Sequence, residues 1–251
     1  MDTLILTIQL MTRIPIHKQI DVDDDMLTRG VACWPVVGLI IGAGQAIVYF
    51  LLSLVLPKSV AAILTVFTEL CINGGFHLDG LCDTADAIYS ARTRERMLEI
   101  MKDSRVGTNG VIAAFLDLTL KITLIMSTNQ TIIVLLMAPV AGKMVQGILM
   151  YKARYAREKG LGHSYIGRIS LAVCLTCTLT GGVFIAVLLG IFGNWQMLFI
   201  PAICCLIAYG FRRYIESKID GMTGDTLGAG SEVIEILFLI LVVAAQTMLW
   251  W

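Results

Sequence analysis

ISLAVCLTCTLTGGVFIAVLLGIF, residues 169–192, contains no charged side chain and decides the fold class. A helix needs about 20 predominantly apolar residues to cross the hydrocarbon core of a bilayer, and this stretch is long enough to cross it with some tilt. Further apolar segments lie at 32–56, 59–76, 108–127, 132–150, 196–211 and 233–251. The sequence therefore predicts an all-α, polytopic membrane helical bundle in a lipid bilayer. We expect a single integral membrane domain, residues 1–251, with about seven transmembrane helices.

The composition agrees with a membrane protein. Of the 251 residues, 57% are hydrophobic and 15% are charged, whereas about a quarter of the residues of a soluble domain are charged. This balance excludes a soluble monomer, and the high hydrophobicity excludes an intrinsically disordered chain. The chain has 19 basic and 19 acidic residues and no net charge. We therefore expect no nucleic-acid partner, because such binding relies on a positive field.

The basic residues indicate how the chain crosses the membrane. Most of them fall into four alternate connections between the apolar segments: 13–29, 92–105, 152–168 and 212–218. The intervening connections hold only Lys58. Because cytoplasmic loops carry an excess of Lys and Arg, we expect these four segments in the cytoplasm.

The segment NGGFHLDGLCDTADAIYSAR, residues 73–92, carries three acidic residues beside a predicted span. On an α-helix, Asp79, Asp83 and Asp86 fall within a sector of roughly 60°. Carboxylates crowded on one face repel each other, and a divalent cation such as Mg²⁺ removes this repulsion. The alternative is an exposed helix start whose acids complement the helix dipole. For His77 the roles of base, ligand and hydrogen-bond anchor all stay open.

Glycines mark two features of the predicted bundle. Gly74 and Gly75 interrupt the second span just before the acidic residues. Broken helices at membrane depth are tolerated where they line a cavity, so we expect broken or re-entrant elements at the active site. Gly38, Gly42 and Gly44 form a small-residue stripe in the first span, which favours close packing by another helix.

Two further polar segments are candidates for binding. Before the third span, a turn holds Arg105 and Asn109; backbone amides at a helix start beside an arginine can form an anion site. We expect Arg105 and Arg92 to contact phosphate, although other charges in 92–110 suit a solvated helix face. In 220–236, four glycines argue against a continuous helix from 220 to 231.

The acidic residues of segment 220–236 allow two interpretations. Asp225 and Glu232 are candidate functional residues, because ionisable groups beside or inside a span are costly. Glu232 and Glu235 could share a face with the first acidic group. The alternative is a flexible loop with glutamates at a helix N-terminus.

Charges deeper in the predicted spans suggest pairing. Asp117 and Lys121 stand four residues apart and are expected to neutralise each other as a structural pair. Glu69 is expected either deep under the site or paired with Lys143.

The motifs identify a family at this point. The chain resembles the cobalamin synthase (adenosylcobinamide-GDP ribazoletransferase) family through GGFHLDGLCDTADA at 74–87, RERMLEIMKDSRVGTNG at 94–110, RYAREKGLG at 154–162 and TGDTLGA at 223–229. The resemblance covers nearly the whole chain. Cys82, Ala85 and Ala87 depart from the usual pattern, but none of them removes a carboxylate.

The resemblance implies a reaction and its participants. Adenosylcobinamide-GDP and α-ribazole, or α-ribazole 5′-phosphate, would give adenosylcobalamin, or its 5′-phosphate, and GMP. Mg²⁺ is the implied cofactor, and the active site, built from segments 73–110 and 220–236, would face the cytoplasm. Whether the acceptor is phosphorylated, and whether the protein forms a homo-oligomer, stays open.

The same resemblance implies roles for the candidate residues. The implied metal ligands are Asp79, Asp83 and Asp86. The implied catalytic residues are His77, Asp86 and Asp83, with His77 or Asp86 taking the hydroxyl proton. The implied phosphate and substrate contacts are Arg92, Arg105, Asn109, Asp225 and Glu232.

Two other classes of membrane protein share part of this acidic pattern. A CDP-alcohol phosphotransferase needs a final aspartate four residues after Asp117, where this chain has Lys121. A cation-coupled carrier would suit acids at membrane depth. Against the carrier, the two halves of the chain show no internal repeat, and the main acidic group lies at one side of the predicted membrane.

Overall fold

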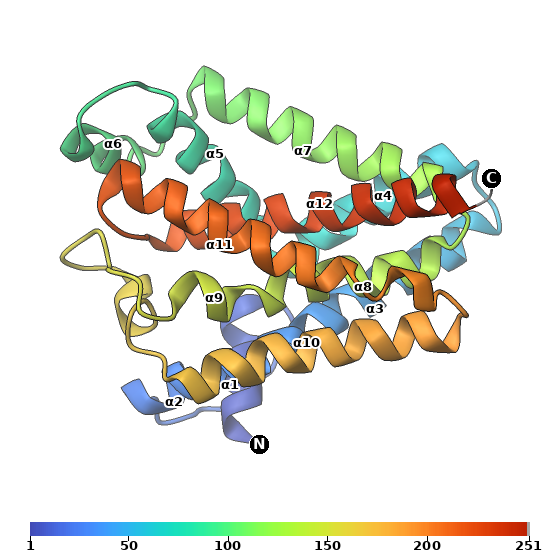
Figure 1. Ribbon diagram of the computed structural model, residues 1–251, viewed down its shortest axis with the longest axis horizontal. Helices are drawn as coiled ribbons and strands as arrows, with labels where there is room; N and C mark the ends of the chain where they lie inside the picture. Colours follow the sequence, from blue (N-terminus) through green and yellow to red (C-terminus); the bar gives the residue numbers. More distant parts are fainter. Residues whose placement is uncertain (250–251) are drawn as a thin grey trace.

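The computed structural model describes residues 1–249 and contains only helices and connections among them (Figure 1). The α-helices are α1 (Asp2–Met11), α2 (Asp24–Gly30), α3 (Trp34–Ser53), α4 (Lys58–Asn73), α5 (Phe76–Ile88), α6 (Arg94–Ile100), α7 (Thr108–Ser127), α8 (Thr131–Met144), α9 (Gln146–Met150), α10 (Leu171–Ile191), α11 (Ile200–Ile219) and α12 (Gly224–Leu249). Short 3-10 turns lie at Val31–Cys33, Leu161–Ser164 and Trp195–Met197.

The helices confirm the predicted all-α membrane bundle. Within the described residues, six helical stretches are long and apolar enough to cross a membrane, and the bent pair of α4 and α5 makes up to seven. The bend between α4 and α5 is 92°. Gly74 and Gly75 form it with φ angles of +71° and +72°, which L-residues with side chains rarely adopt. The predicted break in the second span is therefore confirmed.

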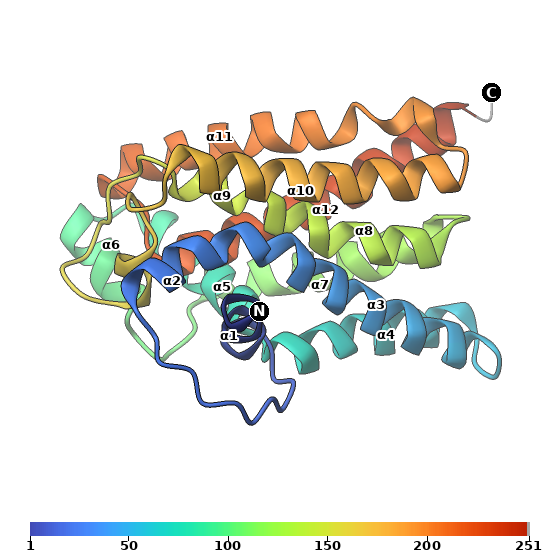
Figure 2. The same ribbon diagram turned by 90° about the horizontal axis from the view of Figure 1, so that it is seen from below.

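The four basic segments lie at the same end of the molecule, on the left in Figure 1. This end, called the α6 end below, holds α2, α6, the segment 151–168 and the connection between α11 and α12 (Figures 1 and 2). The connections poor in basic residues lie at the opposite end. The alternation inferred from charge is thus confirmed, and the compartment that each end faces stays a prediction.

Close helix packing builds the centre of the bundle. The α8–α9 stretch and α12 are the most buried of the candidate spans, while α7 and α10 lie at the periphery. An added Cβ at Gly38 or Gly42 would come within 2.7 Å or 2.6 Å of backbone oxygens of α8. Gly38 and Gly42 of the predicted stripe therefore set how closely α3 approaches α8, whereas Gly44 faces the Ile72 side chain of α4.

The prediction for segment 220–231 is confirmed in that no continuous helix covers it, since residues 220–223 are not helical, but its glycines do not keep the rest of the segment out of a helix. The glycine-rich segment after residue 220 is helical from Gly224, and α12 runs unbroken through Gly228 and Gly230. An added Cβ at Gly228 would lie 3.2 Å from backbone atoms of His77, and one at Gly230 would lie 2.6 Å from the Leu149 side chain. These glycines allow α12 to pack closely, and the packing outweighs their low helix propensity.

Two span boundaries also differ from the predicted ones. The helix expected to end near 211 continues to Ile219, so Arg212 lies on α11. There it donates to the carbonyl oxygens of Ile148 and Tyr151 at the end of α9. The last span, predicted to begin at 233, begins at Gly224 as α12. The last two residues of that prediction, 250 and 251, lie outside the described part of the chain.

Candidate active site

The candidate site lies at the α6 end, where α5 meets the start of α12 (Figure 1). Gly80 makes this contact close, because a Cβ on it would lie 2.6 Å from the backbone oxygen of Asp225. Asp79 is exposed and Asp83 is half-buried. Asp83 interacts electrostatically with Asp79, Asp225 and Asp86, and also with the cationic side chain of Arg157. The structure thus brings two sequence segments together around one acidic group.

The start of α12 is fixed by its own threonines. The backbone N–H of Thr223 donates to Thr226 Oγ1 over 2.8 Å, and the N–H of Thr226 donates back to Thr223 Oγ1 over 3.2 Å. Reciprocal bonds of this kind satisfy amides that a helix start leaves unpaired. Thr223 Oγ1 also donates to the Asp225 carboxylate over 3.3 Å. The TGDT sequence therefore starts the helix and orients the acid.

Arg157 is the residue that the sequence analysis missed. Its Nη2 donates to Asp225 Oδ2 over 2.6 Å, and its Nε is buried with no hydrogen-bond partner among the described residues. The segment 151–168 brings it there: Ala156 N–H donates to the Met222 carbonyl and Met222 N–H donates to the Arg154 carbonyl. The only sequence signal was the RYAREKGLG motif, to which no role had been assigned.

Asp86 has a different environment from the other two aspartates. Its carboxylate accepts the backbone N–H groups of Gly107 over 2.6 Å and Gly110 over 2.8 Å, at the start of α7. The predicted anion site at this helix start therefore exists, but its anion is a side chain of the same protein. Both oxygens of the Asp86 carboxylate are thus engaged by the backbone at the start of α7.

Among the predicted phosphate contacts, neither arginine is paired with the aspartates of α5 in the residues that the structure describes. The Arg105 side chain is 86% exposed and donates to Asp103 Oδ2 over 2.6 Å. This hydrogen bond holds the pKa of Asp103 down at about 2. Arg92 is exposed beyond the end of α5, and Asn109 lines a separate hollow between α5 and α7.

His77 and Glu232 belong to a buried group inside the bundle. Lys121 Nζ lies 3.1 Å from Glu69 Oε1, 3.4 Å from Glu235 Oε2 and in contact with Glu232 Oε2. The predicted pairing with Asp117 is present at 3.9 Å, as one part of this larger group. Glu69 thus pairs with Lys121 rather than with Lys143.

Lys143 extends the same buried group towards α5. Its Nζ lies 2.9 Å from Ser231 Oγ, 3.3 Å from His77 Nδ1 and 3.7 Å from Glu235 Oε1. Glu232 and Glu235 therefore face the two lysines and not the aspartates of α5. His77 is 4% exposed and points into the bundle. The side chains of His77 and Glu232 therefore make their contacts inside the bundle.

The two acidic groups differ in whether their possible ligand atoms lie close enough together to share a metal ion. Within the described residues, the ligand atoms of Glu69, Glu232 and Glu235 lie within 4.8 Å of one another, but the Lys121 ammonium already lies among them. Asp79, Asp83 and Asp86 do not meet this criterion among those residues. Their predicted metal site is therefore not closed by these three carboxylates alone.

The contact between α5 and α12 makes a testable prediction. Gly80→Ala should lower the free energy of unfolding by about 1–3 kcal/mol, because its methyl group would overlap the α12 backbone. Gly182→Ala is the matched control, since nothing lies within 4 Å of a Cβ there. Thermal unfolding in detergent would compare them; equal midpoints for both variants would contradict the packing described.

A helical membrane bundle with a carboxylate and arginine group at one end is typical of an integral membrane enzyme that handles phosphorylated substrates. The family described as cobalamin-5-phosphate synthase matches residues 3–243, and the chain belongs to this family. This membership excludes the CDP-alcohol phosphotransferase and carrier interpretations.

Relatives from several bacteria are similar over nearly their whole length. A protein of Clostridium novyi (strain NT) named adenosylcobinamide-GDP ribazoletransferase is 42% identical over 252 residues, covering 96% of each chain. Proteins with the same name from Listeria monocytogenes serotype 4a (strain HCC23) and Klebsiella pneumoniae (strain 342) are 41% and 38% identical. They cover 97% and 93% of this chain, and 98% and 96% of their own lengths. No solved structure matches the chain significantly.

Proposed function

We propose that this protein is a Mg²⁺-dependent adenosylcobinamide-GDP ribazoletransferase. It joins adenosylcobinamide-GDP to α-ribazole, or to α-ribazole 5′-phosphate, and releases GMP. The names of the relatives support the substrates. The observation that carries the proposal is the half-buried Asp83 among Asp79, Asp225 and Arg157, where α5 meets α12.

The reaction is a displacement at phosphorus. The 3′-hydroxyl of the ribose forms a new P–O bond to the phosphorus nearer the corrinoid, the phosphoanhydride P–O bond breaks, and GMP leaves. Such a transfer requires alignment of the hydroxyl and neutralisation of the phosphate charge. Carboxylate oxygens are hard ligands that suit Mg²⁺, and we assign its binding to Asp79 and Asp83 with Asp225 nearby. When bound, the ion would neutralise charge on the pyrophosphate.

We assign the hydroxyl proton to a carboxylate oxygen of Asp83. Asp86 is less suited, because both its oxygens accept backbone amides of α7. His77 is less suited as well, because it is buried and its Nδ1 faces Lys143. In this account Asp86 positions the start of α7 against α5, and His77 helps to position α5 in the bundle.

Arg157 is proposed as the phosphate-binding cation in place of Arg105. Arg157→Ala should lower kcat/KM about 100-fold, because charge-assisted contacts to a phosphate are strong and no other cation is bound to the Asp225 carboxylate among the described residues. Arg105→Ala removes an exposed side chain paired with Asp103 and should change kcat/KM less than twofold.

Steady-state kinetics with both substrate concentrations varied would measure kcat/KM for the two arginine variants. A large loss for Arg105→Ala with little loss for Arg157→Ala would overturn this assignment.

We also propose on which side of the membrane the site lies. The four basic segments at the α6 end favour a cytoplasmic position in a bacterial inner membrane. Substrates added to one side of sealed, oriented vesicles would test it, with turnover expected on the side of the α6 end.

The proposed reaction itself is tested with the full chain in lipid nanodiscs. We would supply adenosylcobinamide-GDP, α-ribazole and Mg²⁺ and separate the products by chromatography. Equal amounts of GMP and adenosylcobalamin are expected, and both should disappear when the divalent cation is chelated. Folded protein that forms neither product from either form of ribazole would refute the proposed function.

A further inference from the structure

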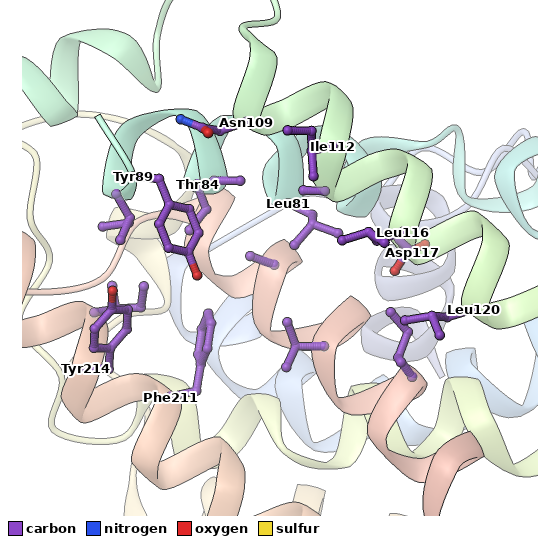
Figure 3. Close-up of a pocket in the computed structure, with 17 residues that line it drawn as sticks. Leu81, Thr84, Tyr89, Asn109, Ile112, Leu116, Asp117, Leu120, Phe211 and Tyr214 are labelled. Carbon is purple, nitrogen blue, oxygen red and sulfur yellow. The ribbon is translucent and has the colours of Figure 1, made fainter. Parts of the chain in front are cut away.

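A hollow of about 410 Å³ lies between α5, α7, α11 and α12, and Asp79 and Asp83 do not line it (Figure 3). Its wall is mostly aliphatic, and the rings of Tyr89, Phe211 and Tyr214 gather at one end of it. Leu81 and Ile88 line it from the side of α5 opposite to Asp79. Binding pockets for small molecules commonly combine such apolar walls with a few polar groups.

Unpaired polar atoms face this hollow. Thr84 Oγ1 is buried and has no hydrogen-bond partner among the described residues. The Asp117 carboxylate accepts no hydrogen bond there either, although its Oδ2 lies 3.9 Å from the Lys121 ammonium. Thr84 is 5% exposed and Asp117 is 2% exposed, and both line the hollow. Leaving such atoms unpaired costs about 1–3 kcal/mol each. A lipid acyl chain would leave the Thr84 hydroxyl unpaired, whereas a heterocyclic ligand with an acceptor nitrogen can pair with it.

The mouth of the hollow adjoins the proposed transfer site. Asn109 lines the hollow and lies between Gly107 and Gly110, whose amides bind Asp86. Tyr89, also in the wall, directly follows the end of α5. A ligand whose ring fills the hollow can therefore extend round the end of α5 towards the acidic group.

We propose that this hollow binds the heteroaromatic base of the nucleoside acceptor, an inference that rests on the proposed function. The base of α-ribazole is a benzimidazole with two methyl groups. Its flat, apolar body suits the aliphatic wall and the three aromatic rings, and its free ring nitrogen can accept a hydrogen bond from the Thr84 hydroxyl. Guanine would leave most of its polar edge unpaired against this wall.

Filling the hollow tests the assignment. Ala113→Phe places a ring in the wall, whereas Val111→Phe adds the same ring to an exposed position of α7 that does not line the hollow. Ala113→Phe should raise KM for α-ribazole about tenfold or more and leave KM for adenosylcobinamide-GDP within twofold. Thr84→Val should raise KM for α-ribazole severalfold with little change in kcat. Val111→Phe should change none of these values.

Each other outcome identifies a different occupant. A rise in KM for adenosylcobinamide-GDP alone would show that the hollow takes part of that substrate. Unchanged KM values, together with loss of a bound lipid from Ala113→Phe in native mass spectrometry, would show a lipid site. Either result overturns the proposal.

A direct binding measurement separates this inference from the proposed function. Calorimetry would follow α-ribazole binding to the full chain without the second substrate, and Ala113→Phe should weaken it by the same factor. Binding that Ala113→Phe weakens, from a protein that forms no cobalamin, would refute the proposed function and keep this site. Normal turnover with unweakened α-ribazole binding would refute the site and keep the function.

Discussion

Asp83→Asn should lower kcat about 1,000-fold or more and leave the fold intact. The substitution keeps the shape of the side chain but removes its charge, its capacity to take a proton and its preference for a divalent cation. Asp83 is half-buried on α5 and interacts with Asp79, Asp225 and Arg157, so the substitution acts at the centre of the acidic group. GMP release in nanodiscs, at saturating concentrations of both substrates, would measure the loss.

Asp103→Asn is the matched control for this experiment. Asp103 is an aspartate of the same end of the molecule, paired with the exposed Arg105, and its loss should change kcat less than twofold. Thermal unfolding should give similar midpoints for both variants. Turnover by Asp83→Asn within tenfold of the unsubstituted protein would refute the central role of this carboxylate.

Lys121→Met should destabilise the protein by about 3–5 kcal/mol, the second large effect expected. The Lys121 ammonium contacts Glu69, Glu232 and Glu235 inside the bundle, and its side chain is 5% exposed. Removing it leaves buried carboxylates facing each other without that cation. We would measure the midpoint of thermal unfolding and the yield of monodisperse protein.

Two further variants make this result specific. Lys102→Met removes an exposed lysine and should leave the unfolding midpoint unchanged. Glu232→Gln, added to Lys121→Met, removes one of the repelling charges and should recover part of the lost stability. A Lys121→Met protein as stable as Lys102→Met would show that the buried group does not hold the bundle together.

The fold was largely predictable because its main determinants are local. Charge-free runs such as 169–192 define spans by themselves, and Gly74 and Gly75 mark the bend between α4 and α5. The start of α12 was not predictable in this way. Gly228 and Gly230 weaken an isolated helix. They favour the folded structure only because they allow α12 to pack closely against α5 and Leu149.

The acidic residues of the site could be predicted from the sequence, but the residues that contact them could not. The helical spacing of Asp79 and Asp83 placed them on one face, and the structure adds Asp225 from a distant segment. The roles of Asp86 and Arg157 depend on contacts that the chain makes far along the sequence, with the amides of Gly107 and Gly110 and with Asp225. Spacing within one segment carries no information about such contacts.

The most direct test of the central claim uses adenosylcobinamide-GDP with sulfur in place of a nonbridging oxygen on the phosphorus nearer the corrinoid. Sulfur binds Mg²⁺ poorly and softer cations such as Cd²⁺ well. If a divalent cation held by Asp79 and Asp83 contacts this phosphate, one diastereomer should turn over slowly with Mg²⁺ and recover with Cd²⁺. Asp83→Asn should abolish that recovery. Turnover of both diastereomers that does not depend on the cation supplied would contradict the account.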